Sequence, residues 1–359
     1  MQFPTIRIEK RRCRKCRRYE KNNYTYAVIL SLVLPLLATG CGSTRLTDPA
    51  ATVIDAVDYD SHEIDDRSFI ARTRTMELKM KDGALLAGIH DICADEQQLY
   101  VLDQMKTITS FNVHTGVQTA RIDKVGHAAG EYVNPMAITC SKDTVYVLDL
   151  SDFKIICYNT KLQYLRSIRL PGAALDFAKV SDGFLLFNPN PSEPQVIHID
   201  NNGKSLGSYL PASTSLDLIL SDKAFSEGEN ENVYFIAPAT NAIYLWQNGA
   251  LNEAFKLNFD SQEVEAERSS EIIKKQKANV MNAFVSHNYV MTLFLAKFVT
   301  FSIYRRSTGK TESGLVNISI PYPFCPKILH GNTLIDIEEA SPSKTQKSGN
   351  VAIFYELRK

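Results

Sequence analysis

The sequence predicts an all-β protein: a six-bladed β-propeller of four-stranded antiparallel blades, with the ring closed by an N-terminal strand. Three features indicate this fold. A strand motif recurs six times, turns containing Asn, Asp or Gly follow five of its copies, and a lone strand-like segment precedes the first complete repeat. Repeats of roughly 40 to 50 residues with four strands each are typical of propellers. We therefore expect one propeller over residues 71–359.

The repeated motif is clearest at residues 99–103 and 145–149, which read LYVLD and VYVLD, and weaker copies begin at residues 184, 233, 290 and 351. In the first five repeats the motif is followed by a second strand, a turn whose residues tolerate positive φ, and a further strand. With the strand that precedes the motif, each repeat supplies four strands. Helical solenoids are excluded by this strand periodicity.

The last repeat has no room for a fourth strand after Lys359, whereas residues 75–80 form a strand-like segment before the first complete repeat. An open ring would leave two unpaired strand edges exposed. We therefore expect residues 75–80 to pair with the C-terminal blade. One insertion, residues 261–282, mixes charged and apolar residues in a way that favours a helix.

Residues 1–40 have the composition of a secretory signal. Nine basic residues lie between residues 7 and 21, and an apolar run follows over residues 27–38. This run is shorter than the roughly 20 residues that a membrane-spanning helix needs. The segment ATGC at residues 38–41 resembles the bacterial lipobox, in which the cysteine thiol is lipidated. We therefore expect a lipid anchor on Cys41 and a flexible tether over residues 41–70.

The charge of the mature chain argues against nucleic acid as a partner. The whole sequence carries 40 basic and 40 acidic side chains, but the first 40 residues hold nine basic and two acidic ones, so residues 41–359 have a net charge of −7. Phosphate binding needs a concentrated basic face. The four later cysteines stand singly in apolar surroundings, which predicts buried thiols: Cys93, Cys140, Cys157 and Cys325.

The loop at residues 126–132 reads GHAAGEY and is similar to the G-x-G-P-G-E-Y loop of the six-bladed β-propeller lipoproteins of Bacteroidetes, which are related in architecture to NHL-repeat proteins. Ala128 and Ala129 replace the Gly and Pro of that family. The final strand, residues 350–359, resembles the aromatic-rich ending of the same family. The resemblance implies a fold and an address in the cell envelope, but no single activity.

The same loop also has a structural interpretation. Gly130 can adopt a backbone conformation that is closed to other residues, Glu131 can accept bonds from neighbouring amides, and Tyr132 can pack between blades. Asp103 and Asp149 end the two clearest motif copies. Because they recur at equivalent positions, we expect them to cap turns.

Chemistry on a propeller usually lies at a mouth of the central channel. His90 and Asp91, Asn134 and Asp176 precede or lie in innermost strands, where carboxylates and amides could hold calcium as in gluconolactonase-like hydrolases. Three or more converging carboxylates would favour an enzyme. A mouth lined by aromatic residues and poor in carboxylates would favour a binding module.

No nucleophile elbow, metalloprotease motif, phosphate-binding loop or dinucleotide fingerprint is present, and no two histidines have metal-ligand spacing. We therefore expect a binding or scaffold module for a peptide, glycan or protein, with no catalytic residue and no cofactor. The alternative is a calcium-dependent hydrolase or lyase at the central channel. The expected location is the outer membrane, facing the periplasm. The candidate binding residues are His127, Glu131, Tyr132, Asn134, His90 and Asp91.

Overall fold

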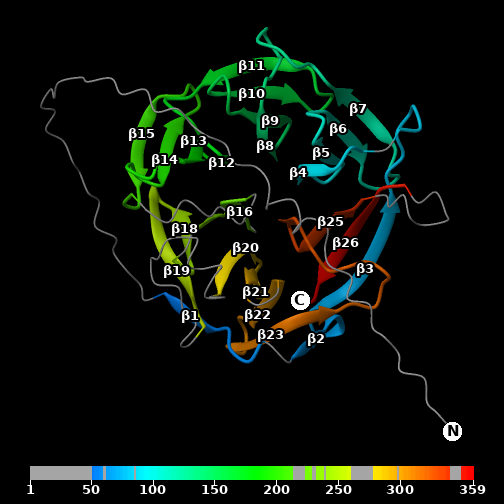
Figure 1. Ribbon diagram of the computed structural model, residues 1–359, viewed down its shortest axis with the longest axis vertical. Helices are drawn as coiled ribbons and strands as arrows, with labels where there is room; N and C mark the ends of the chain where they lie inside the picture. Colours follow the sequence, from blue (N-terminus) through cyan, green and yellow to red (C-terminus); the bar gives the residue numbers. More distant parts are fainter. Residues whose placement is uncertain are drawn as a thin grey trace, which may run out of the picture. The chain divides into compact units, whose positions relative to one another are not determined.

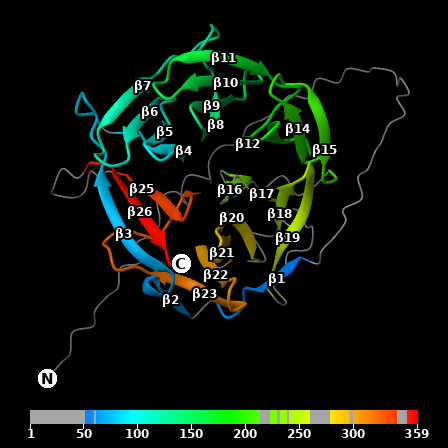
Figure 2. The same ribbon diagram turned by 180° about the vertical axis from the view of Figure 1, so that it is seen from behind.

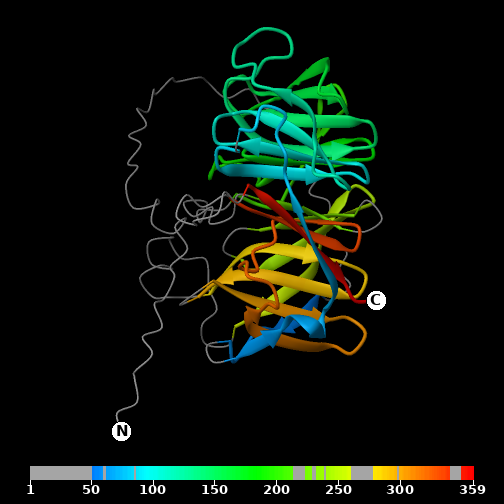
Figure 3. The same ribbon diagram turned by 90° about the vertical axis from the view of Figure 1, so that its right-hand side faces the viewer.

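Six β-sheets surround a central axis in the computed structural model (Figure 1, and from behind in Figure 2). The structure describes residues 51–59, 62–84, 86–212, 223–228, 232–237, 240–259, 278–296, 299–339 and 349–359. Seen from the side, the strands of the blades run between the two faces of the ring (Figure 3). The all-β six-bladed propeller predicted from the sequence is confirmed.

Within each blade the strands follow the chain from the channel outward, and N-terminal strands take the outermost places in blades 4 to 6. Blades 1 to 3 contain β4 (Ile89–Ala94), β5 (Gln98–Asp103), β6 (Ile108–Asn112) and β7 (Gln118–Ile122); β8 (Pro135–Ser141), β9 (Thr144–Asp149), β10 (Lys154–Asn159) and β11 (Tyr164–Arg169); and β12 (Asp176–Val180), β13 (Gly183–Phe187), β14 (Val196–Asp200) and β15 (Ser205–Tyr209). Blades 4 and 5 contain β16 (Phe225–Glu227), β17 (Val233–Ile236), β18 (Ala242–Gln247), β19 (Ala250–Asn258) and β1 (Thr52–Asp55); and β20 (Asn279–Val285), β21 (Tyr289–Leu295), β22 (Val299–Arg305), β23 (Lys310–Asn317) and β2 (Glu63–Asp65). Blade 6 contains β24 (Ile328–His330), β25 (Thr333–Glu338), β26 (Val351–Leu357) and β3 (Ile70–Glu77).

The ring closes at both its inner and its outer circumference. Each inner strand contacts the inner strand of the next blade, and β24 of blade 6 contacts β4 of blade 1. At the outside, the N-terminal strand β3 pairs antiparallel with the C-terminal strand β26, with Thr75 opposite Ile353 (Figure 1). Closure by an N-terminal strand is therefore confirmed, but the strand runs from Ile70 to Glu77, so only residues 75–77 of the predicted range 75–80 belong to it.

The repeated motif occupies the second strand in blades 1 to 5 but the third strand, β26, in blade 6. In that blade the second strand is β25, whose four central residues are also buried. The motif therefore marks a buried strand and not a fixed place in the blade. Burial of the thiols was predicted correctly for Cys93, Cys140 and Cys157, whereas Cys325 is exposed.

The flexible tether predicted for residues 41–70 is wrong from residue 52 onward. Strand β1 joins the outer edge of blade 4, parallel to β19, and β2 joins blade 5, parallel to β23. A short 3₁₀ turn, η2 (Asp66–Ser68), then leads into β3. Ile54, Ile64 and Phe69 are at most 1% exposed. We call this segment, residues 51–69, the strap, because pairing and burial hold it against the outer edges of two blades.

Two further predictions fall wholly or partly outside the described residues. The signal sequence and Cys41 lie outside them, as do residues 261–277 of the expected helical insertion. Residues 279–282 of that insertion belong to strand β20, so the prediction of a helix is wrong there. Among the described residues, no helix is long and apolar enough to cross a membrane.

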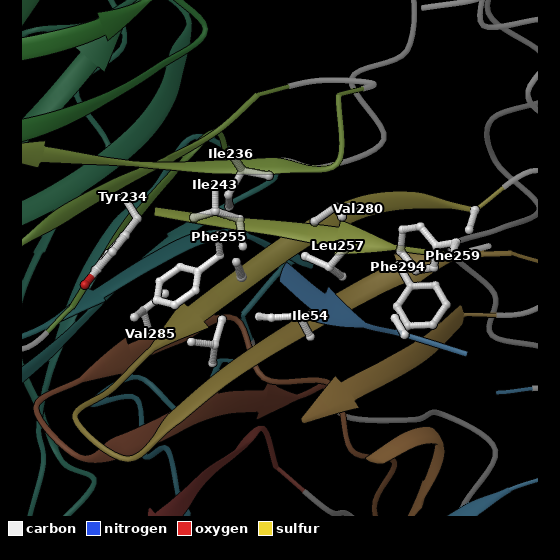
Figure 4. Packing of buried hydrophobic residues seen from close by; sticks show 14 of the residues in the cluster. Ile54, Tyr234, Ile236, Ile243, Phe255, Leu257, Phe259, Val280, Val285 and Phe294 are labelled. Atoms are coloured by element: carbon white, nitrogen blue, oxygen red, sulfur yellow. The ribbon is translucent and has the colours of Figure 1, made fainter. Parts of the chain in front are cut away.

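The hydrophobic core consists of clusters between neighbouring blades. Figure 4 shows the cluster between blades 4 and 5, where Ile54 of the strap lies beside Leu257 and the rings of Phe259 and Phe294 meet at 4.9 Å. Each fully buried side chain of this kind stabilises the fold by about 1.5–3 kcal/mol. Side chains that alternate along a strand face opposite neighbours, so each blade contributes to two clusters.

Candidate functional site

Three inner strands carry a polar side chain at the same level of the channel. Asp91 of β4, Asp176 of β12 and Asn282 of β20 occupy equivalent places, because each lies opposite a matching residue of the second strand of its blade. Each side chain accepts a hydrogen bond of 2.7–2.9 Å from the N–H of the next residue. The polar side chains therefore recur in blades 1, 3 and 5.

The two aspartates also bind the inner strand of the following blade. Asp91 Oδ2 accepts the N–H of Ile138 at 2.8 Å. Asp176 Oδ2 accepts the N–H groups of Ala224 and Phe225 at 2.6 and 3.0 Å. Buried backbone N–H groups need such partners. Asp91 and Asp176 thus connect blade 1 to blade 2 and blade 3 to blade 4.

Lys223, which precedes β16, brings a positive charge to these carboxylates. Its Nζ lies 2.8 Å from Asp91 Oδ2, and its side chain is 16% exposed. Burial lowers the pKa of Lys223, but the carboxylates of Asp91 and Asp176 outweigh it, so that the pKa lies above its usual value. Burial raises the pKa of Asp176 to about 6, although Lys223 acts in the opposite direction. We call these three residues the channel cluster.

The channel beside this cluster is narrow. The cavity between the inner strands has a volume of about 40 Å³, which is room for a few water molecules and not for a substrate. Thr139 Oγ1 donates to Glu227 Oε1 at 2.5 Å, which links the inner strands of blades 2 and 4. Within the part of the chain that the structure describes, no group of three or more His, Cys, Asp or Glu side chains is placed to hold a metal ion.

The loop at residues 126–134 connects β7 to β8 on the face where the inner strands begin. Tyr132 is fully buried and donates through its hydroxyl to the carbonyl of Ile122 at 3.2 Å. Tyr158 donates to the carbonyl of Gly130 at 3.1 Å, and Gly130 has a φ of +75°. Glu131 accepts the N–H of Ala128 at 3.0 Å. These contacts agree with the structural interpretation of the motif.

The remaining residues selected from the sequence differ in exposure. His127 is 77% exposed in its side chain, and its Nδ1 lies 3.0 Å from Asp152 Oδ1. His90 Nε2 lies 2.9 Å from the carbonyl oxygen of Met136, so β4 meets the start of β8 there. The structure therefore brings His90 near the end of the loop, but it leaves only His127 well exposed.

The two motif aspartates cap turns as predicted. Asp149 Oδ1 accepts the N–H of Ser151 in the turn at 3.1 Å. Asp149 Oδ1 and Oδ2 also accept the N–H groups of Asn134 and Val133, each at 2.9 Å. Asp103 Oδ1 accepts the N–H groups of Met105 and Thr107, each at 2.9 Å. The backbone of Asn134 is thus held by Asp149, which fixes the end of the loop.

A larger opening lies on the opposite face, between blade 6 and blade 1. This groove has a volume of about 330 Å³, within the range of small-ligand sites. Its apolar part is formed by Val113, Ile335 and Phe354. Its ionisable side chains are Arg72, Arg74, Asp95, Glu96, His330 and Glu356. Strand register explains the location, since Arg72 lies opposite Glu356 and Arg74 opposite Phe354 on one face of blade 6.

Charges of both signs line this groove without pairing. Among the described residues, neither Arg72 nor Arg74 makes an ion pair with a carboxylate, and neither Glu96 nor Glu356 makes one with a cation. The Arg74 guanidinium lies 3.9 Å from the centre of the Phe354 ring. Burial lowers the pKa of Arg74, and the charge of Arg72 adds to this effect.

Reasoning from the sequence missed both Lys223 and the groove. Arg72 and Arg74 fall at the junction of the expected tether and the closing strand, and their partners Phe354 and Glu356 lie near the other end of the chain. The one signal for them was the predicted pairing of the two ends, which places these residues side by side. No local sequence pattern identifies Lys223, because it comes close to Asp91 only when the ring of blades has formed.

Comparisons with known proteins agree on the fold. A family model described as a domain of unknown function, DUF4934, matches residues 51–352. A Bacteroides fragilis protein described as exported is 14% identical, with a TM-score of 0.67 over 86% of this chain and 100% of its own. A Bacteroides vulgatus member of the DUF4221 family is 10% identical, with a TM-score of 0.52 over 80% of this chain and 97% of its own. A comparison with curated proteins finds no match.

Proposed function

The chain belongs to the DUF4934 family, and we propose that it is a non-catalytic binding protein of the cell envelope whose ligand occupies the groove between blades 6 and 1. The observation that carries this proposal is the set of charged side chains in that groove that make no ion pair with one another. Charged groups that stay unpaired beside an apolar floor are suited to bind a polar ligand.

The channel supports the alternative of a metal-dependent hydrolase less well. Asp91 already accepts two backbone N–H groups and the Lys223 ammonium, and Asp176 accepts three backbone N–H groups. Calcium takes six to eight oxygen ligands, and these residues do not fit such a site. We therefore assign no catalytic residue and derive no step through a metal ion.

The proposed location is the outer membrane, facing the periplasm, with the chain held by a lipid on Cys41. The basic and apolar signal before Cys41 supports export, as does the description of the similar Bacteroides fragilis protein as exported. Mass spectrometry of the membrane fraction should find a lipidated N-terminal cysteine, and Cys41→Ser should release the protein. An unmodified N-terminus in the wild type would refute the anchor.

The binding proposal can be tested by the thermal unfolding of the full chain in detergent with a panel of small molecules: amino acids, dipeptides, sugar acids, neutral sugars and amines. A ligand at 100 times its Kd stabilises the fold by about 2.7 kcal/mol. We expect at least one class to raise the Tm of the wild type and of the control Glu77→Gln, which lies on β3 outside the groove. Arg74→Gln should abolish the increase. An equal increase in the Tm of Arg74→Gln would show that the ligand binds outside the groove.

A further inference from the structure

We propose that the groove binds a small zwitterion with an apolar side chain, namely a free α-amino acid or a dipeptide. This inference rests on the proposed function and names the chemistry of its ligand. It follows from the presence of arginines, carboxylates and an apolar floor within one groove.

The register of blade 6 sets out this arrangement in two adjacent rows. The outer row contains Arg72 and Glu356, which lie opposite each other on β3 and β26. The next row contains Arg74, Phe354 and Ile335 across β3, β26 and β25. Because neighbouring rows on one face of a sheet lie within side-chain reach, two guanidinium groups stand next to an aromatic and aliphatic floor.

The two arginines of the groove are suited to bind a carboxylate. Arg72 and Arg74 project from the same face of β3, two residues apart, and each guanidinium offers donors in a planar fork that matches a carboxylate. Arg74 is held against the Phe354 ring, and its one hydrogen bond within the described part of the chain is to Met76 Sδ at 3.6 Å. A bound carboxylate would relieve the repulsion between the two cations.

The carboxylates of the groove are suited to bind an ammonium group. Asp95 is committed to its own turn, since its Oδ1 accepts the N–H groups of Gln97 and Gln98, each at 2.7 Å. Glu96 of blade 1 and Glu356 of blade 6 make neither an ion pair nor a side-chain hydrogen bond among the described residues. These two carboxylates remain open to a ligand cation.

A ligand with only one charge would pair with the groove side chains of one sign and desolvate those of the other sign. Burial of a charged group without a partner is unfavourable, so an anion would be disfavoured by Glu96 and Glu356, and an amine by the arginines. A volume of about 330 Å³ accommodates an amino acid or a dipeptide. Val113, Ile335 and Phe354 then contact its apolar side chain.

The test is isothermal titration of the full chain with L-leucine and the dipeptide Ala-Leu, compared with two analogues that each lack one charge. 4-Methylpentanoate lacks the ammonium group of leucine, and 3-methylbutylamine lacks its carboxylate. We expect leucine or the dipeptide to bind at least tenfold more tightly than either analogue. The comparison between leucine and Ala-Leu distinguishes a free amino acid from a dipeptide.

Variants locate the site and separate its two charges. Arg74→Gln and Glu96→Gln should each weaken leucine or Ala-Leu at least tenfold, Arg74→Lys should recover part of the loss, and the control Glu77→Gln should bind as the wild type. Glu96 is on an exposed turn, so its variant keeps the test decisive if a change at Arg74 disturbs folding.

Each outcome either supports or overturns the proposal. If 4-methylpentanoate binds as tightly as leucine and its binding depends on Arg74, the ligand is an anion. The zwitterion proposal is then wrong, whereas the proposal that the groove is the binding site is supported. If leucine binds equally to wild type, Arg74→Gln and Glu96→Gln, the groove is not the site. If no member of the panel binds the wild type, both the zwitterion and the proposed binding function fail.

Discussion

The channel cluster and the groove between blades 6 and 1 both contain acidic and basic side chains, but only the channel cluster pairs them. Lys223 lies 2.8 Å from Asp91, and backbone N–H groups occupy the remaining oxygens of Asp91 and Asp176. In the groove, Arg72 and Glu356 face each other across two strands without an ion pair. The charges of the channel cluster are paired with one another or with backbone N–H groups, whereas the charges of the groove make no ion pair among the described residues.

Burial explains this difference. A buried charge without a partner is strongly unfavourable, so residues inside the ring must satisfy one another. Solvent screens exposed charges at little cost, so the rim of the groove tolerates unpaired groups. Function in a propeller usually lies at the channel, but the channel of this chain is narrow and its charges are paired, which is why we propose that the ligand binds in the groove.

The largest effect is expected from removal of the strap, residues 51–69, which leaves every residue of both regions in place. The deletion removes the buried side chains of Ile54, Ile64 and Phe69. Because each contributes about 1.5–3 kcal/mol, the free energy of unfolding should fall by roughly 5 kcal/mol or more. Urea denaturation measures this loss. A truncation that ends before Thr52 is the control, and equal stability of the two would show that the strap does not support the ring.

Lys223→Met should destabilise the protein by about 3–5 kcal/mol, because it leaves Asp91 and Asp176 buried without the cation between them. Chemical denaturation at pH 7 checks this value. The double variant with Asp91→Asn should recover part of the loss, since it removes one of the stranded charges. A change below about 1 kcal/mol would mean that the channel is more hydrated than its burial indicates.

Asp176 should give stability an unusual pH dependence. Because burial raises its pKa to about 6, the folded state retains a proton that the unfolded chain releases near pH 4. The contribution of Asp176 to the free energy of unfolding should therefore fall as pH rises from about 4 to 6, by roughly 3 kcal/mol. Asp176→Asn should lack this decline when both proteins are unfolded by urea across that range. Parallel pH curves for the two would contradict the raised pKa.

The smallest effect is expected in the groove. Glu356→Gln removes an exposed charge that has no partner among the described residues, so stability should change by less than about 0.5 kcal/mol. Thermal unfolding without ligand measures it. A loss comparable to that of Lys223→Met would show that this carboxylate supports the ring and is not reserved for a ligand.

The ring could be predicted from the sequence because its signals are local. Copies such as LYVLD and VYVLD identify buried strands, and a lone strand before the first repeat identifies the closing strand. The strap could not be recognised in this way. Strands β1 and β2 are three or four residues long and gain their stability from the blade edges that they join, so no periodicity within the segment reveals them.

The candidate sites were less predictable, because they depend on contacts between distant parts of the chain. Asp91 and Asp176 could be selected as polar residues of inner strands, but Lys223 lies 132 residues from Asp91 in sequence. The loop motif drew attention to Glu131 and Tyr132, whose side chains serve the loop itself. Arg72 and Arg74 come to lie beside Glu356 and Phe354 only when the two ends of the chain pair.

The three N-terminal strands also limit the order in which the ring can form. Strands β1, β2 and β3 are made before all other strands, yet their partners lie in β19, β23 and β26. Contacts between such distant segments form slowly, and an N-terminal segment that emerges first must remain extended until they arrive. Strand β3 therefore stays without its partner until β26 has been synthesised, and the interval before β26 appears is when this chain is most exposed to aggregation.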